Sequence, residues 1–482
     1  MDGILAQLLP EWTLQLTYLV AGILFIQGLR DMTHPRTATR GNLISSGGMF
    51  LAVVVTILWF EILSPAILAA GLLIGGAVGA YLAVSVETTE MPQLVGLFNG
   101  FGGGASAVVA GAELIDVLAA GGSLTAGLTT TAAIAGIIGS VTFSGSLIAA
   151  GKLHGLVGDS PVSATVGHVI KAAFLSVAVL AGLYLVIQPT VFGSVPLAEW
   201  IPAYWLLVAA ALLLGISLVV PIGGADMPVV IALLNSYSGL AAATTGFVLD
   251  NTVLIIAGTL VGASGMILTV IMCESMNRSL TNVLFGGLGT DEGDGEDMED
   301  IYEGQITETS PEEVVMLLET ANRVVIVPGY GMAVAQAQHA VAELVELLDE
   351  HGVDVEFGIH PVAGRMPGHM NALLAEADVP YEKMRELEEV NPNFSQTDLV
   401  IVTGANDVVN PRANEDDSSP IAGMPILNVT EARHVVVNKR SLSPGFSGIA
   451  NPLFARDNTS MLFGDAKESM QELVNQYKEA TS

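Results

Sequence analysis

The sequence has almost no cysteine, since Cys273 is the single one among its 482 residues. One cysteine excludes an internal disulfide and a metal site built from several cysteines, and it suits a reducing compartment. Positive charge is also scarce, since 17 Lys and Arg stand against 48 Asp and Glu, for a net charge of −31. Such acidity argues against nucleic acid or anionic lipid as a partner and fits a solvated acidic surface, as in proteins that work in high salt.

Charged residues of both signs are few and unevenly placed. They make up 13% of the chain, hydrophobic residues make up 51%, and the mean hydropathy is +0.60, which is too apolar for an ordinary soluble protein. Residues 1–290 contain 6 Lys and Arg and 13 Asp and Glu (net −7), and residues 291–482 contain 11 and 35 (net −24), which together give −31. We therefore expect a membrane region followed by an acidic soluble domain.

Nine stretches of the first region are apolar over about 17–25 residues, the length that crosses a bilayer. They are 14–30, 42–60, 65–86, 92–111, 127–150, 168–188, 203–221, 228–247 and 252–273. The N-terminus lacks a basic segment and a clear small-residue cleavage site, so the first stretch is predicted to be a retained helix. The sequence predicts an α-helical transmembrane bundle of about nine helices.

The basic residues of this region predict its orientation. They are Arg30, Arg36, Arg40, Lys152, Lys171 and Arg278. With nine helices and the N-terminus outside, all six lie on the cytoplasmic side, and the opposite loops (61–64, 112–126, 189–202 and 248–251) contain none. Because basic residues favour the cytoplasmic side, we expect the C-terminal domain in the cytoplasm.

The rest of the chain begins with an acidic segment and then alternates between strands and helices. Residues 289–309 have little apolar content, which is typical of a linker. Ser310 is an N-cap serine followed by proline and, three residues on, by glutamate, which predicts the start of a helix. We therefore predict a membrane domain over 1–288, a linker over 289–309 and a soluble domain over 310–482.

Within the soluble part, strands are predicted at 323–327, 353–359, 398–403, 426–428 and 434–438, and helices at 331–350 and about 466–478. This alternation predicts a Rossmann-like α/β domain with a parallel sheet. Gly329 and Gly331 follow the first strand, where they would allow a tight turn and the approach of a pyrophosphate to a helix N-terminus. The third glycine of the usual fingerprint is Val334, and a plain tight turn is the alternative.

The strand ends favour one nicotinamide cofactor over the other. A site for NAD has an acidic residue at the end of the second strand, but here that strand ends Phe357-Gly358-Ile359-His360. Lys439-Arg440-Ser441 follows a later strand, and two cations with a hydroxyl suit the 2′-phosphate of NADP(H). A solvated pair of cations is the alternative. Further glycine-rich loops at 361–368, 403–407 and 444–448 also follow strand ends, where α/β sheets bind ligands.

Two membrane helices begin alike. Residues 90–101 (EMPQLVGLFNGF) align without gaps on 226–237 (DMPVVIALLNSY), and 143–145 match 263–265 in the helices that follow. This pattern predicts a duplicated two-helix unit with both copies running the same way. Glu90 and Asp226 could simply cap their helices.

Asn99 and Asn235 occupy equivalent positions of this repeat. They lie about 13 Å into their helices, near mid-bilayer. Polar groups at that depth face the bundle interior or a wet cavity, or they make a hydrogen bond that packs helices.

These segments together resemble the beta subunit of the proton-translocating NAD(P) transhydrogenases, over nearly the whole chain. In the soluble part the resemblance lies in GYGMAVAQAQ (329–338), FGIHPVAGRMPGHMN (357–371), GANDVVNP (404–411), SPIAGMP (419–425), KRS (439–441), NPLF (451–454) and MLFGDAK (461–467). In the membrane part it lies in ETTEMPQLVGLFN, VTFSGSLIAAGK, GGADMPVVIALLNSYSG and IMCESMNRS.

The resemblance implies an enzyme that transfers hydride between NADH and NADP⁺ and couples this transfer to proton translocation. The chain has no second dinucleotide fingerprint, so NAD(H) is expected on a separate alpha subunit, in an alpha/beta heterodimer paired into a dimer. The expected location is a prokaryotic inner (plasma) membrane. No catalytic residue or metal is predicted, because the cofactors carry the hydride chemistry. The alternative is a transporter or channel with an NADP(H)-sensing cytoplasmic domain.

The resemblance also implies which residues bind NADP(H). Lys439 and Arg440 would hold the 2′-phosphate, with Ser441 beside them in the predicted cofactor site. The pyrophosphate would lie on Gly329, Tyr330, Gly331, Val334 and Ala335. The site lining would be Ala363, Gly364, Arg365, Met366, Gly404, Ala405, Asn406 and Asp407, with Gly445, Phe446, Ser447 and Gly448 as a lid and Gly464 and Asp465 completing the set.

Asp407 matches an acid thought to link nucleotide state to protonation, and an Asx-type turn is its alternative. Phe446 stands where the family often has tyrosine, so a hydroxyl contact is lost.

The implied proton path contains Glu90, Asn99, Ser144, Asp226, Asn235 and Ser264. Some family members have a histidine, thought to relay protons, where this chain has Asn99. Asparagine cannot titrate, so the relay group is expected elsewhere, for example on the partner's helices, with Asn99 and Asn235 holding water.

Overall fold

A computed structural model describes residues 8–33, 35–60, 65–158, 164–192, 197–285, 302, 306–445 and 447–481. By its contacts the chain divides into two units, one formed by 1–221 with 231–268 and the other by 222–230 with 269–482. Most of the predicted linker, 289–309, lies outside the described residues. The boundaries predicted near 288 and 310 stay predictions.

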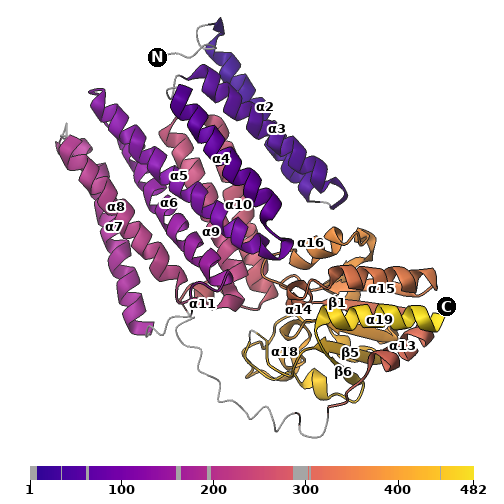
Figure 1. Ribbon diagram of the computed structural model, residues 1–482. Coiled ribbons are helices and arrows are strands. Elements are labelled where there is room, and N and C mark those ends of the chain that lie inside the picture. The colour runs from indigo at the N-terminus through magenta and orange to yellow at the C-terminus, as the bar shows by residue number, and fades with distance from the viewer. Residues whose placement is uncertain are drawn as a thin grey trace. The chain divides into compact units, whose positions relative to one another are not determined.

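Nine helices among the described residues are long and apolar enough to cross a membrane, which confirms the predicted bundle (Figure 1). They are α2 (Glu11–Met32), α3 (Pro35–Trp59), α4 (Pro65–Ser85), α5 (Met91–Ala119), α6 (Ala126–Leu153), α7 (Ala164–Phe192), α8 (Leu197–Val219), α9 (Met227–Val248) and α10 (Thr252–Ser275). A short helix, α11 (Leu280–Phe285), follows. The chain is therefore a multi-pass membrane protein.

Glycines bring the membrane helices close together. A Cβ atom on Gly103 of α5 would lie 2.6 Å from the carbonyl oxygen of Gly139 on α6, and one on Gly265 of α10 would lie 2.6 Å from the backbone nitrogen of Ser236 on α9. Lipid offers no hydrophobic drive for helices to associate, so close packing of small residues holds such bundles together. This packing positions the polar side chains of α5 and α9.

The two copies of the predicted repeat share their local structure. A 3-10 turn, η1 (Thr88–Glu90) before α5 and η2 (Gly224–Asp226) before α9, ends in each case at the acidic residue. Each long helix then begins at the methionine of the Met-Pro pair.

Six parallel strands form a single sheet in the C-terminal part. They are β1 (Arg323–Pro328), β2 (Asp354–Ile359), β3 (Met384–Glu386), β4 (Leu399–Thr403), β5 (His434–Lys439) and β6 (Thr459–Phe463). Their order is β3-β2-β1-β4-β5-β6, which is that of the doubly wound dinucleotide-binding fold. The order reverses between β1 and β4, and ligands of such sheets bind beyond the carboxyl ends of the strands at this point. The predicted α/β domain is confirmed.

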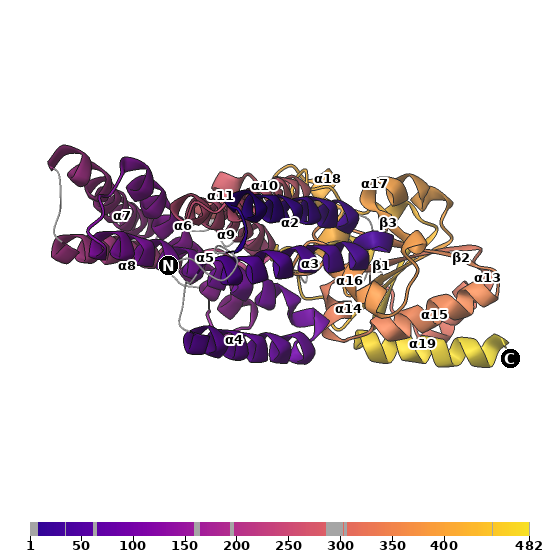
Figure 2. The ribbon, with the colours of Figure 1, turned by 90° about the horizontal axis from the view of Figure 1, so that it is seen from above.

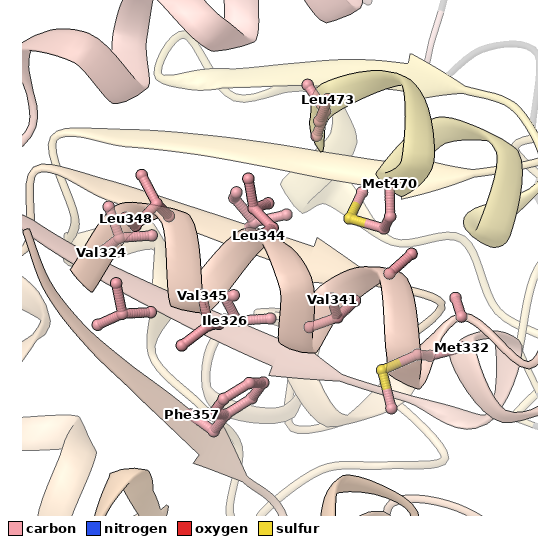
Figure 3. Close-up of a cluster of buried hydrophobic side chains, with 14 of the residues drawn as sticks. Val324, Ile326, Met332, Val341, Leu344, Val345, Leu348, Phe357, Met470 and Leu473 are labelled. Atoms are coloured by element: carbon pink, nitrogen blue, oxygen red, sulfur yellow. The ribbon is translucent and has the colours of Figure 1, made fainter. Parts of the chain in front are cut away.

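The two faces of the sheet are covered differently (Figure 2). The side chains of Val324 and Ile326 face one core, and those of Val325 and Val327 face the other. The first core lies under α13 (Pro311–Thr320), α15 (Gln338–Glu350), α16 (His369–Glu376) and α19 (Ala466–Thr481), and we call this side the helical face (Figure 3). The second, the loop face, is covered by α17 (Leu387–Val390), α18 (Arg412–Glu415) and the 3-10 turns η4 (Asn391–Gln396), η6 (Val429–Glu431) and η7 (Pro452–Ala455).

The predicted single helix over 331–350 is wrong, because the chain breaks it in two. The five-residue α14 (Tyr330–Val334) ends where Gln336 adopts a left-handed conformation with φ of 51°. The amide of Gln336 then donates to the Ala333 carbonyl, and the amide of Ala337 donates to the Met332 carbonyl, both at 3.0 Å. This is a Schellman ending, formed here without glycine.

The predicted strand at 426–428 is also wrong. The amide of Leu427 donates to the Val408 carbonyl (2.9 Å), and the amide of Asn428 donates to Oδ1 of Asn391 (3.1 Å). The run is buried in the loop face without pairing in the sheet. Strands β3 and β6 were not predicted.

The predicted helix start at Ser310 is confirmed. The amide of Glu313 donates to Oγ of Ser310 at 3.4 Å, which caps α13. Just before it, the amide of Met461 donates to the Thr307 carbonyl (2.8 Å), and the amide of Thr309 donates to the Met461 carbonyl (3.0 Å). Residues 307–309 therefore run along β6, at the edge of the sheet.

Candidate functional site

The predicted cofactor residues follow the carboxyl ends of five strands of one sheet. Gly329 to Ala335 follow β1, Ala363 to Met366 follow β2, Gly404 to Asp407 follow β4, Arg440 to Gly448 follow Lys439 at the end of β5, and Gly464 and Asp465 follow β6. Phe446 lies outside the described residues. The parallel register places these ends at one edge, as the fold-level argument predicted.

The loops after β1 and β4 touch backbone to backbone. The amide of Gly329 donates to the Thr403 carbonyl (2.9 Å), and that of Gly331 donates to the Gly404 carbonyl (2.8 Å). A Cβ atom on Gly331 would lie 2.7 Å from Cα of Gly404, which itself has a positive φ of 68°. These glycines are required by the contact between the loops. Because both amides are already bonded, the predicted pyrophosphate contact must use other groups of this turn.

The loop after β2 brings an arginine and a buried histidine to Tyr330. The Arg365 guanidinium carbon lies 4.4 Å from the Tyr330 ring centroid, within cation–π range. The amide of Arg365 donates to Nδ1 of His369 (3.0 Å). Gly364 has a φ of 104°, and a Cβ atom there would lie 2.6 Å from the His369 ring. Burial, assisted by the Arg365 charge, lowers the pKa of His369 to about 4, so the ring is neutral at pH 7.

His360, where an NAD site would end in an acid, has another role. Its Nε2 bonds to the Pro425 carbonyl (2.7 Å), and its Nδ1 accepts from the Val362 amide (3.2 Å). Burial lowers the pKa of His360 to about 4, although the bond to Pro425 acts in the opposite direction. The residue after β2 is therefore a neutral histidine, and its bond to Pro425 connects the end of the strand to the loop face.

The buried polar atoms without a hydrogen-bond partner in the described part of the chain include Nε2 of His369 and Nδ2 of Asn406, which lie beside these loops. Because Nδ1 of His369 accepts a bond from Arg365, its Nε2 carries the proton. Both atoms are then donors. Buried donors are nearly always satisfied in folded proteins, so the arrangement fits a ligand with acceptor oxygens, such as NADP(H).

The end of β5 carries a half-buried cation. Burial lowers the pKa of the Lys439 ammonium, and the nearby Asp407 carboxylate raises it. Its Nζ donates to the Ser443 carbonyl. Oγ of Ser441 donates to Oγ of Ser443 at 2.9 Å, and Arg440 is exposed. Ser443 is a further hydroxyl that the sequence reasoning missed, although its spacing two residues after Ser441 could have suggested it.

The predicted lid lies on Asp407. Oγ of Ser447 donates to Oδ1 of Asp407 (2.7 Å), and the amide of Ser447 donates to Oδ2 (3.0 Å). A Cβ atom on Gly445 would lie 2.6 Å from Oδ1. The carboxylate is thus bonded to a residue 40 positions away, and it does not form the local Asx-type turn that was the alternative.

The residues after β6 contact the end of β5 and the start of α19. The amide of Gly464 donates to the Lys439 carbonyl at 3.1 Å. Oδ1 of Asp465 accepts from the amide of Lys467 at the start of α19 (3.0 Å). Asp465 is therefore engaged in starting a helix.

The membrane polar residues point in different directions. Asn99 is buried and its Nδ2 donates to the Ile231 carbonyl on α9 at 3.4 Å, which is the helix-packing bond weighed above. Oγ of Ser144 donates to the Leu212 carbonyl on α8 (2.7 Å). Asn235 is half-buried, whereas Ser264 is exposed and bonds within α10. The described contacts therefore join Asn99 to α9 and direct Ser144 to α8.

The two acids of the repeat differ. Glu90 is half-buried and makes no side-chain cap hydrogen bond, so the capping role weighed for it is not found. Asp226 is buried, and its Oδ2 accepts from Nη1 of Arg278 at 2.7 Å.

Comparison with known proteins identifies the family. A family model described as "NAD(P) transhydrogenase beta subunit" matches residues 14–476. The chain is 46% identical over 461 residues to the protein named "NAD(P) transhydrogenase subunit beta" of Rhodospirillum rubrum, covering 95% of this chain and 97% of the relative. A second relative with this name, from a designated strain of the same species, matches equally. The chain belongs to the NAD(P) transhydrogenase beta subunit family.

The family match covers both parts of the chain, the membrane helices and the α/β fold. The match also spans the strand-end loops described above. Besides Ser443, the sequence reasoning missed Asn451, whose side chain contacts the loop of Asp407. Its Nδ2 lies 3.0 Å from Oδ1 of Asn406.

Proposed function

We propose that this chain is the NADP(H)-binding and membrane subunit of a transhydrogenase that transfers hydride between NADH and NADP⁺ and couples the transfer to proton translocation. NAD(H) would be bound by a separate alpha subunit, in an alpha/beta heterodimer paired into a dimer. The observation that carries the proposal is the half-buried Lys439 beside Ser441 and Ser443, on a sheet whose β2 ends in a neutral histidine.

The residues of this chain bind and orient. Lys439, with Arg440 and Ser441, would neutralise and hold the 2′-phosphate, which also offsets the cost of burying the ammonium. Tyr330 and Arg365 would flank the pyrophosphate. When bound, NADP(H) itself supplies the hydride chemistry at its nicotinamide. The lid at 445–448 would exclude water from the transfer between the two nicotinamides.

The remaining expectations form part of the proposal. The N-terminus is outside and the C-terminal domain is cytoplasmic in a prokaryotic inner membrane, with a membrane domain over 1–288, a linker over 289–309 and a nucleotide domain over 310–482. The six basic residues before 290 support this orientation.

For the proton path we propose the set Glu90, Asn99, Ser144, Asp226, Asn235 and Ser264, with Asn99 and Asn235 holding water. The burial of Asn99 among the helices fits this set, and its bond to the Ile231 carbonyl is the helix-packing contact that the experiment must separate from a role in proton movement. Proton pumping should fall in an Asn99→Ala variant while hydride transfer in uncoupled vesicles continues. Pumping that stays coupled at the wild-type rate would contradict the assignment.

The test of the main proposal is reduction of an NADP⁺ analogue by NADH, in vesicles that contain this chain and its partner. Rates that rise with an uncoupler support a proton pump. An NADP(H)-sensing transporter or channel would instead bind NADPH and show no reduction.

A further inference from the structure

Tyr302, a residue of the predicted linker 289–309, is buried in the loop face of the C-terminal α/β fold. Its side chain is 7% exposed and packs in the core with Phe394, Val408 and Val435. A tyrosine in such a place normally needs partners for its hydroxyl. Both partners are backbone groups of Asn451. Its backbone amide donates to the hydroxyl at 2.8 Å, and its backbone carbonyl accepts from the hydroxyl at 3.4 Å.

The hydroxyl contact leads to the Asp407 loop. Asn451 is 1% exposed, and its Nδ2 donates to the carbonyl of Asn406 (3.1 Å) and to its Oδ1 (3.0 Å). Its Oδ1 accepts from the amide of Leu453 (3.0 Å), which fixes the orientation of the side-chain amide. Asn406 immediately precedes Asp407, the carboxylate that holds the lid through Ser447. The hydroxyl of Tyr302 therefore fixes the residue that positions this loop.

The ring of Tyr302 is connected, through Phe454, to Lys439, the cation proposed to bind the 2′-phosphate. The Tyr302 ring is stacked on that of Phe454, with centroids 6.2 Å apart and planes 25° from parallel. The ammonium of Lys439 lies 5.5 Å from the centroid of the same Phe454 ring, within cation–π range. Tyr302 is thus linked to both halves of the candidate site. Its hydroxyl is connected to the Asp407 loop through Asn451, and its ring is connected to Lys439 through Phe454.

We propose that Tyr302 is a positioning residue that connects the predicted linker to the NADP(H) site through these two separate contacts. The proposal rests on the proposed NADP(H)-binding function and adds a regulation to it. A displacement of the linker that withdraws Tyr302 loosens the Asp407 loop and the Lys439 side chain together. NADP(H) is then released faster and is distinguished less well from NAD(H).

The experiment uses the full chain in lipid nanodiscs and measures NADPH release and the affinities for NADPH and NADH by cofactor fluorescence. Tyr302→Phe keeps the ring and loses the hydroxyl, so we expect NADPH release about tenfold faster with the preference for NADPH over NADH within twofold of wild type. Tyr302→Leu loses both contacts, so we expect the same faster release and a preference that falls about five- to tenfold.

Tyr477→Phe is the control, since Tyr477 is also buried but lies in the core of the helical face. It should leave both quantities unchanged. Release from Tyr302→Phe within twofold of wild type overturns the proposal, and so does an equal loss of both nucleotides in Tyr302→Leu, which a purely structural role would produce. Wild-type protein that fails to bind NADPH contradicts the proposed function instead. Hydrogen exchange of the β4 amides, unchanged in all variants, verifies that the fold is intact.

Discussion

The two faces of the sheet are both buried but are built in different ways. The helical face is formed by whole helices whose apolar residues recur at helical spacing, such as Val341, Leu344 and Leu348 of α15 (Figure 3). The loop face is formed by 3-10 turns and by asparagine side chains that bond to backbone carbonyls, as Asn391 and Asn451 do. We therefore expect loop-face contacts near Asp407 and Lys439 to affect cofactor binding as well as stability, and the core of the helical face to contribute mainly to stability.

The largest effect expected from this difference is on stability at the helical face. Leu344→Ala removes a fully buried side chain and leaves a cavity, which should lower the free energy of unfolding by about 3 kcal/mol. Hydrogen exchange of the β1 amides in the full chain measures this loss. NADPH affinity should stay within twofold, and a tenfold loss of affinity would mean that the two faces are not independent.

The next effect is on binding at the loop-face edge. Lys439→Ala removes a cation from the 2′-phosphate site, and NADPH should bind about 100-fold more weakly, or ~2.7 kcal/mol. Lys478→Ala is the matched control, because Lys478 pairs with Glu343 on the helical face (2.6 Å). NADH affinity should change little in either variant. An equal loss for NADH and NADPH would show that Lys439 does not contact the 2′-phosphate.

Two histidines should make stability depend on pH, His360 beside the loop face and His369 on the helical side. The pKa of each folded ring is lowered to about 4, below the unfolded value of about 6.5. The unfolded chain therefore binds protons first as the pH falls below about 6.5, and stability is lost until about pH 4. Each histidine contributes about 1.4 kcal/mol per pH unit in this window.

His360→Gln should halve the slope between pH 6 and 5, measured by hydrogen exchange of the sheet. His369→Gln, as the matched variant, should halve it as well. A slope equal to wild type in either variant would show that the ring concerned is not neutral in the folded protein.

The smallest effect expected is at the lid. Ser447→Ala removes the 2.7 Å bond to Asp407 and keeps the backbone bond, so NADPH release should be about fivefold faster. Stopped-flow fluorescence measures this rate. Ser418→Ala is a suitable control, because Oγ of Ser418 likewise donates to an aspartate, Oδ1 of Asp416, on an exposed loop (2.6 Å). Faster release in the control would point to a general surface effect.

The sequence predicted the membrane helices and the inner strands, since their apolar runs have the length that each element needs. It failed at a left-handed helix ending without glycine and at an apolar run that is held by a contact distant in the chain. Gln336 adopts a left-handed conformation that nothing in its own sequence demands, and the apolar run at 426–428 is held by Asn391 in place of a strand partner. Periodicity does not report such contacts.

For the candidate site, the argument from strand ends located the loops, because a parallel sheet brings them to one edge. It did not show which side chains meet there. Ser447 is 40 residues from Asp407, and Asn451 is 149 residues from Tyr302. These pairings arise from the crossovers of the chain and leave no local pattern.

The short extended stretch at 307–309 has a consequence for solubility. Strand β6 is the last of its sheet, and an uncovered last strand is a template for another chain. By bonding to both backbone groups of Met461, the stretch covers this edge in each molecule. A fragment that began at Ser310 would expose the edge and would tend to associate into aggregates, although every residue of its sheet was present.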